Sequence, residues 1–150
     1  MRILKLVFIS VIVLSLIVTA LSALIPSHVR ISRAIDIRSS VSPAKYVSDI
    51  SAWKQWNKFV QHNDTTLTIE IIRATNDSIF TTWKQGSGRK FESSFVFLKG
   101  QNYTTVQWFF DFHLKWYPWE KFQSIIYDKQ MGPEMESSLT GLKRIVETSP

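Results

Sequence analysis

Asp111 and His113 are the side chains of this sequence whose types and spacing could support catalysis. They stand two residues apart in the segment YTTVQWFFDFHL, so in a strand both project to the same side as Gln107 and Phe109. An imidazole beside a carboxylate can act as a general base. No third partner is visible, however, and no serine stands in a nucleophile-elbow context. We therefore assign no catalytic residue, and we favour a binding module over an enzyme.

Metal-ligand chemistry has little support in the sequence. The three histidines, His28, His62 and His113, lie far apart, and no His, Asp or Glu cluster has metal-ligand spacing. The chain contains no cysteine, which excludes a disulfide, a thiolate metal site and a cysteine nucleophile. We predict neither a metal nor a cofactor.

Large apolar side chains are the strongest candidates for a binding site. The chain has 10 Phe, 6 Trp and 4 Tyr, and every tryptophan lies between Trp53 and Trp119. A concave sheet that faces a helix would gather such residues around an apolar pocket of roughly 300–1,000 Å³. The alternative is a filled core, because rings of this size occupy the space that a ligand needs. The candidate lining residues are Trp83, Phe95, Phe97, Trp108, Phe110 and Phe112 on strands, and Ile126, Met131 and Met135 on the last helix.

The elements that must position these residues are preceded by an uncharged segment, LVFISVIVLSLIVTALSALI, at residues 6–25. A helix of this length spans about 30 Å, which is the thickness of the hydrocarbon core of a bilayer. A signal peptide has a shorter apolar stretch of about 7–15 residues, although Ala20-Leu21-Ser22 could serve as its cleavage site. The length favours a single-pass anchor over residues 1–26. Basic residues flank it on both sides, so the membrane orientation stays open.

Residues 27–150 predict one α+β domain. Alternation at residues 28–38 predicts a strand with one apolar face that Arg33 interrupts. Ser42, as an N-cap hydroxyl, and Pro43 predict one or two short helices that end near Lys58. Four strand-like segments follow, and short turn-like links, among them ATND, QGSG and KGQN, predict an antiparallel meander. Residues 63–65 are expected to form a turn. The four segments are TLTIEII, SIFTTWK, RKFESSFVFLK and YTTVQWFFDFHL.

Apolar residues three and four positions apart predict a long helix with one apolar stripe from Pro118 to Glu147. Gly132 and Pro133, the two poorest helix formers, stand in its middle. Pro133 removes a backbone donor and clashes with the carbonyl of Lys129. We therefore predict a kink or short break there, which lets two helical segments follow a curved sheet.

The segment KWYPWEKF, residues 115–122, allows two interpretations. Its aromatic rings and lysines could lie at the headgroup level of a membrane. The favoured interpretation is structural, with Pro118 near the start of the last helix. Charge does not separate the two: the net charge is +6 and its basic residues are interspersed. That pattern suits an anionic lipid surface better than nucleic acid, which we do not expect as a partner.

Four stretches resemble the membrane-anchored bacterial branch of the SRPBCC superfamily. Its members are described as polyketide cyclase/dehydrase and lipid-transport-like proteins, and they share a helix-grip fold related to START domains. The segment TLTIEIIRATNDSIFTTWKQGSGRKF is shorter than its counterpart in the family, so one or two strands are expected to be shortened or missing. The resemblance implies an antiparallel sheet wrapped around the C-terminal helix, a hydrophobic ligand and a bacterial cell membrane. The four stretches are LIPSHVRISRAIDI, SPAKYVSDISAWKQWNKF, WYPWEKF and DKQMGPEMESSLTGLKRIVE.

The sequence thus predicts a membrane-anchored binding module for a hydrophobic small molecule or lipid, held between the sheet and the C-terminal helix. Two alternatives remain. A cyclase or aromatase-type enzyme needs an acid/base group directed into the cavity. A structural or interaction protein would have a collapsed cavity and an exposed apolar patch instead.

Overall fold

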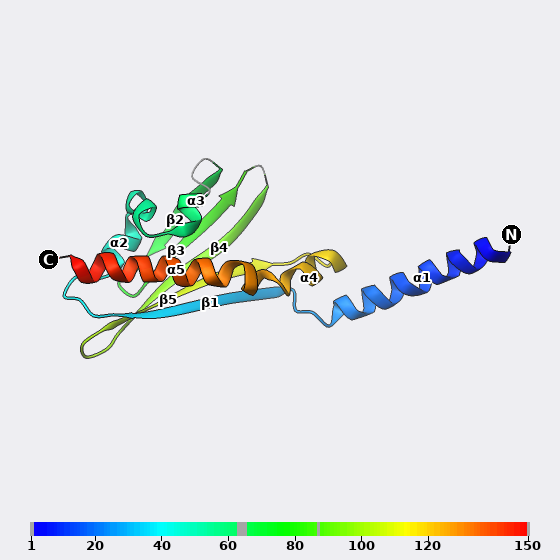
Figure 1. Ribbon diagram of the computed structural model, residues 1–150, viewed down its shortest axis with the longest axis horizontal. Coiled ribbons are helices and arrows are strands. Elements are labelled where there is room, and N and C mark those ends of the chain that lie inside the picture. The colour runs from blue at the N-terminus through cyan, green and yellow to red at the C-terminus, as the bar shows by residue number, and fades with distance from the viewer. Residues whose placement is uncertain (1, 63–65, 87, 150) are drawn as a thin grey trace. The chain divides into compact units, whose positions relative to one another are not determined.

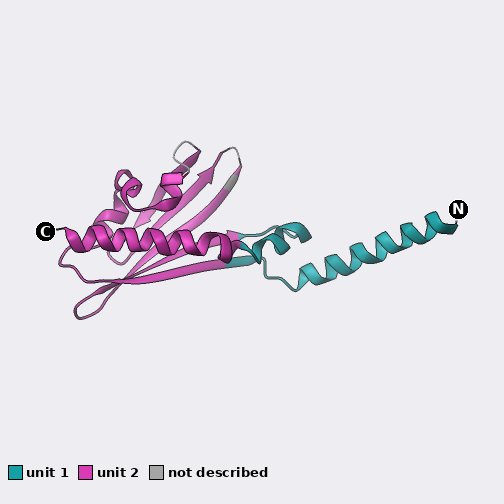
Figure 2. Cartoon of the chain, viewed as in Figure 1, with its two compact units in different colours: residues 1–29, 113–126 teal, residues 30–112, 127–150 magenta. Residues whose placement is uncertain are grey.

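The computed structural model of the chain describes residues 2–62, 66–86 and 88–149. These residues form two compact units, shown in different colours in Figure 2. Unit 1 comprises residues 1–29 and 113–126, and unit 2 comprises residues 30–112 and 127–150. The sequence-based division at residues 26 and 27 stays a prediction. The turn expected at residues 63–65 lies outside the described residues.

Unit 1 contains two helices. The first, α1 (Arg2–Ala23), is the one helix among the described residues that is long and apolar enough to cross a membrane. The second, α4 (Pro118–Ser124), packs against α1. The two chain segments that connect the units also meet here, because the N–H of Leu114 donates to the carbonyl oxygen of Ser27 at 2.8 Å.

A five-stranded antiparallel sheet forms the body of unit 2, in the order β1-β5-β4-β3-β2 (Figure 1). The meander predicted from the short links is confirmed, and the first strand closes its far edge against the last. Strict alternation of apolar and polar residues explains the strand bounds. The strands are β1 (His28–Ile37), β2 (Leu67–Ala74), β3 (Ser78–Gln85), β4 (Arg89–Lys99) and β5 (Thr104–His113).

Three short helices follow β1, where the sequence predicts one or two: α2 (Ala44–Ser48), η1 (Ile50–Gln55) and α3 (Lys58–His62). Pro43 takes the N-cap position of α2, and no side chain caps that helix, so the predicted Ser42 hydroxyl cap is wrong. The backbone carbonyl of Ser42 accepts from Lys45 N instead. The next two starts have side-chain caps, because Asp49 accepts from Ser51 N and Asn57 accepts from Phe59 N, both at 3.0 Å.

The long helix α5 (Tyr127–Thr148) lies along one face of the sheet (Figure 1). The α+β helix-grip architecture predicted from the sequence is therefore confirmed. The break predicted at Gly132 and Pro133 is wrong in its position, because the chain leaves the helical pattern at residues 125 and 126 and α5 continues through Pro133.

An arginine from β1 explains why α5 continues. Arg33 Nη1 lies 3.0 Å from Asp128 Oδ1, and its Nε lies 2.7 Å from Glu136 Oε1. The two acidic residues stand on either side of Gly132, and a Cβ on Gly132 would collide with the Arg33 guanidinium. Hydrogen bonds from Asp128 and then Glu136 raise the pKa of Arg33 above its ordinary value. The arginine therefore bridges the helix across the backbone bond that Pro133 removes.

Candidate ligand-binding site

The inner face of the sheet carries a layer of aromatic rings, which we call the aromatic layer. Its centre is dry, because Trp83, Phe95, Trp108 and Phe110 are each 0% exposed. The rings contact one another: the centroids of Phe95 and Trp108 lie 4.9 Å apart and those of Trp83 and Phe110 lie 5.1 Å apart. The short helices add Trp53 and Trp56, and the whole layer comprises Trp53, Trp56, Phe59, Trp83, Phe91, Phe95, Trp108, Phe110, Phe112 and Tyr127.

Buried hydroxyl and carbonyl groups pair with most of the indole N–H groups. Trp108 Nε1 donates to Ser93 Oγ at 2.6 Å, and Trp83 Nε1 donates to Thr81 Oγ1 at 2.9 Å. Trp53 Nε1 reaches a backbone carbonyl oxygen at 2.9 Å. Among the described residues, Trp56 Nε1 has no partner although it is buried. The pairing holds three of the four indoles in defined orientations, which favours a rigid core.

The helix side of the layer is less uniform. Met135 on α5 is fully buried, and Met131 is half-buried. Ile126 belongs to unit 1 and is 43% exposed. Phe97 and Phe112 complete the predicted set, the first buried and the second half-buried. That these residues bind a ligand stays a prediction.

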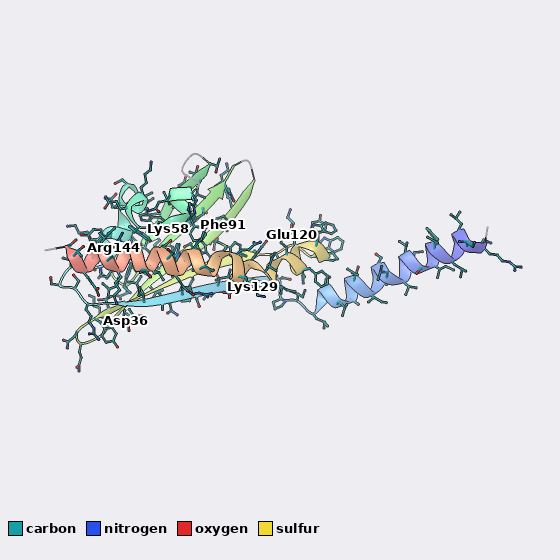
Figure 3. The ribbon with its side chains drawn as sticks, viewed as in Figure 1. Asp36, Lys58, Phe91, Glu120, Lys129 and Arg144 are labelled. Carbon is teal, nitrogen blue, oxygen red and sulfur yellow. The ribbon has the colours of Figure 1, made fainter. Side chains whose placement is uncertain are left out.

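One end of the aromatic layer is not fully covered. Phe59, Phe91 and Phe112 are half-buried, whereas the rings at the centre are inaccessible. Phe91, labelled in Figure 3, lies 5.6 Å from Phe110 and 5.7 Å from Phe112 between centroids. The apolar surface is therefore continuous from the dry centre to this end. Phe91 was missing from the candidate list, although its alternation with Phe95 and Phe97 on β4 is the signal that would have found it.

Asp111 does not join the aromatic layer, because its side chain alternates away from Phe110 and Phe112. Its carboxylate receives two hydrogen bonds from Arg30, Nε to Oδ1 at 2.7 Å and Nη2 to Oδ2 at 3.1 Å. This bonding raises the pKa of Arg30 above its ordinary value. His113 lies in unit 1, with its ring centroid 4.9 Å from that of His28. Asp111 and His113 therefore provide no acid/base pair directed into the layer.

A second concavity lies on the outer face of the sheet. It has a volume of about 360 Å³, and the Arg30–Asp111 ion pair forms part of its wall together with Arg73, Phe80 and Glu92. Arg73 stacks over the Phe80 ring at 5.1 Å. This cleft is shallow and mixed in charge. Among the described residues, no group of three or more His, Asp or Glu side chains could hold a metal ion.

Comparison with solved structures identifies the architecture. The di-domain ARO/CYC StfQ from the steffimycin biosynthetic pathway matches with a TM-score of 0.60 and 8% identity, over 80% of this chain and 51% of StfQ. CalU16 from Micromonospora echinospora matches with a TM-score of 0.53 and 11% identity, over 82% of this chain and 76% of that one. The chain has the helix-grip fold. The resemblance predicted from the sequence is thus confirmed at the level of fold.

The Aha1 dimer from Colwellia psychrerythraea is a further match, with a TM-score of 0.52 and 17% identity over 80% of this chain and 97% of that one. The chain spans about half of StfQ. No protein-family model matches the chain, and no curated protein matches it either. At these identities the helix-grip matches establish the fold, and function has to be argued from the residues.

Proposed function

We propose that this protein is a membrane-anchored binding module for a hydrophobic small molecule or lipid. The observation that carries the proposal is the continuity of the aromatic layer with the half-buried rings of Phe59, Phe91 and Phe112. Helix-grip neighbours such as StfQ support a fold that surrounds a hydrophobic ligand. The ligand would insert between the sheet and α5 at this end of the layer.

Apolar burial would drive binding. Burial of about 200 Å² of apolar ligand surface contributes about 5 kcal/mol at 25 cal/mol per Å². The centre of the layer is already occupied by Trp83, Phe95 and Trp108, so the ligand would contact them only after rotation of Phe91 or Phe112. Rotation of half-buried rings costs less than rotation of rings at the dry centre, because fewer atoms must move.

The anchor is α1. Its 22 residues give a helix of about 33 Å, and its side chains are exposed almost throughout. An apolar helix of this length with exposed side chains is stable in a bilayer and not in water. The alternative, a signal sequence, predicts that the mature chain lacks residues 1–22. Mass measurement of the protein from membranes distinguishes the two, because cleavage would remove the mass of α1.

Ligand recovery from the full chain tests the binding proposal. The protein is purified in detergent, and bound molecules are identified by native mass spectrometry and by organic extraction. We expect a recurrent apolar species that also raises the melting temperature. Repeated recovery of bare protein, with no stabilisation by any fatty acid or phospholipid added back, would sink the proposal.

Two phenylalanines provide matched variants. Phe91→Ala removes a half-buried ring from the open end of the layer, whereas Phe80→Ala removes a ring that is 36% exposed on the outer face. We expect Phe91→Ala to weaken binding about tenfold, since a lost contact of about 1.4 kcal/mol has that effect. Phe80→Ala should leave the affinity unchanged.

The alternative is a domain whose aromatic layer is only a core. Complete burial of Trp83, Phe95 and Trp108 supports this possibility, because a ring at 0% exposure offers no surface to a ligand. Under this alternative, Phe91→Ala and Phe80→Ala differ in stability alone, and no ligand is recovered from either.

A further inference from the structure

Helix α4 has its polar and apolar sides reversed. Trp119 is 66% exposed and Phe122 is 39% exposed, whereas Lys121 and Ser124 are only 7% and 5% exposed. A helix on a water-soluble surface turns its charged residues outward and its apolar residues inward. The reversal extends beyond the helix, since Trp116 before it and Ile125 after it are exposed by 71% and 62%. This surface is therefore suited to an apolar environment.

The buried lysine connects α4 to the end of α1. Lys121 Nζ donates to the carbonyl oxygen of Ile25 at 2.8 Å, just beyond the last turn of α1. The C-terminal end of a helix carries a partial negative charge, so a cation is favourable there. Ser124 Oγ donates to the carbonyl oxygen of Lys121 at 2.7 Å. These contacts hold α4 beside the point where the apolar helix ends.

That position corresponds to the headgroup level of a bilayer. The uncharged segment of α1 accounts for about 30 Å of hydrocarbon, so the residues after Ala23 lie at the membrane–water interface. Tryptophan and tyrosine are enriched at this level because their rings combine an apolar body with a polar N–H or O–H. Tyr117 stacks on Trp119 with centroids 4.8 Å apart and planes at 9°, and Trp116 lies 4.9 Å from Tyr117.

The charges of this segment agree with the same environment. Glu120 accepts a hydrogen bond from the backbone N–H of Lys115 at 3.0 Å, which turns its carboxylate toward the protein backbone. The side chain of Lys115 is exposed and available to lipid phosphates. The local surface therefore offers a cation and apolar rings to the membrane.

We propose that residues 116–126, the interfacial belt, insert into the headgroup region of the bilayer that α1 spans. The occupant of this surface is lipid: phosphate oxygens contact Lys115, and the upper methylene groups contact Trp116, Trp119 and Phe122. The proposal rests on the proposed anchoring by α1 for its geometry. It reverses the structural interpretation that the sequence favoured for KWYPWEKF.

The distribution of tryptophans provides the test. The full chain is reconstituted into vesicles of phosphatidylcholine and phosphatidylglycerol whose acyl chains carry bromine near the headgroup or, in parallel, near the terminal methyl. Bromine quenches only indoles in contact with lipid. Trp53, Trp56, Trp83 and Trp108 are 0–1% exposed, so the quenched signal should come from Trp116 and Trp119. We expect shallow bromine to quench more than deep bromine.

A conservative double variant assigns the signal. Trp116→Phe with Trp119→Phe keeps the apolar surface and removes both indoles, and we expect it to abolish most of the bromolipid quenching. The proposal is overturned if quenching persists in this variant. It is equally overturned if acrylamide in the aqueous phase quenches Trp116 and Trp119 in the reconstituted wild type. Protection from both quenchers would also overturn it, because a protein partner or a second copy would then cover the face.

Alkaline carbonate extraction separates this proposal from anchoring by α1. Retention of the chain without bromolipid quenching leaves the anchor intact and removes the belt. Quenching in a chain that carbonate extracts supports the belt and removes the spanning helix. Loss of both overturns both.

Discussion

The six tryptophans of this chain occupy two regions with opposite surroundings. Four lie in the aromatic layer of unit 2 at 0–1% exposure, and the two on the interfacial belt of unit 1 are exposed by 71% and 66%. In the layer, each ring contacts other rings, and three indole N–H groups have acceptors within the protein. On the belt, apolar rings point outward while a lysine is buried. The same residue type therefore supports packing in one region and a surface for lipid in the other.

The surroundings of each region explain the difference. A curved sheet covered by α5 removes ring surface from water, and this burial stabilises the fold. Helix α4 has seven residues and a single partner helix, so it cannot enclose its own rings. Exposed rings beside an apolar helix are stable where the solvent is lipid. Changes in the two regions should therefore have effects on different properties.

The largest expected effect comes from truncation of a ring at the centre of the layer. Trp108→Ala should lower the free energy of unfolding by about 3–5 kcal/mol, because it leaves a cavity among close-packed rings. Urea denaturation in detergent, followed by circular dichroism, measures it. Trp119→Ala is the control and should change the free energy of unfolding by less than about 0.5 kcal/mol, as exposed positions do. Equal effects would erase the distinction between the two regions.

A hydroxyl tests whether the indole orientations matter. Ser93→Ala leaves the N–H of Trp108 buried without an acceptor and should cost about 1–3 kcal/mol. The double change Ser93→Ala with Trp108→Phe removes donor and acceptor together, so its cost should be smaller than the sum of the two single costs. Strict additivity would show that the 2.6 Å contact contributes nothing.

The approach of α5 to the layer depends on a glycine. A Cβ on Gly141 would lie 2.9 Å from the backbone oxygen of Trp56, which cannot move independently. Gly141→Ala should cost about 1–2 kcal/mol after the gain in helix propensity is subtracted. Gly132→Ala meets the mobile end of Arg33 instead and should cost less. The reverse order would mean that the arginine bridge is stiffer than the backbone contact.

The smallest expected effect is a pH dependence at η1, the element that carries Trp53 into the layer. A hydrogen bond from the Ser51 hydroxyl, followed by bonds from the backbone N–H groups of Ser51 and Ala52, lowers the pKa of Asp49 below its ordinary value. The contribution of this cap is therefore present above the ordinary aspartate pKa of about 3.9 and is lost as pH falls through the depressed folded value. NMR titration of the Asp49 carboxyl should show the lowered midpoint. Ser51→Ala should return it toward the ordinary value, and an unchanged midpoint would contradict the assignment.

Regular alternation made much of the fold predictable. The first strand was predicted at residues 28–38 and observed at residues 28–37, and RKFESSFVFLK matches β4 along its whole length. Alternation also placed Trp108, Phe110 and Phe112 on one face. Side chains follow strand geometry with a period of two, so these inferences needed no tertiary contact.

Tertiary contacts decided the features that the sequence did not predict correctly. Pro133 stays inside α5 because Arg33, far away in the sequence, bridges Asp128 and Glu136. Ser42 leaves α2 without a side-chain cap, although its residue type favours that role. The burial of Lys121 depends on the carbonyl group at the end of α1. None of these partners is near in sequence, and single-residue propensities do not contain them.

The bridge from Arg33 to Glu136 joins residues that are 103 positions apart, and this separation has a consequence for synthesis. A growing chain completes all five strands by His113, well before α5 has been translated. The inner face of the sheet then presents its tryptophans and phenylalanines without a cover, which is an aggregation-prone state. The final docking of α5 therefore follows the end of translation closely, and a chain truncated before Tyr127 would fail in the cell by aggregation rather than by loss of a binding contact.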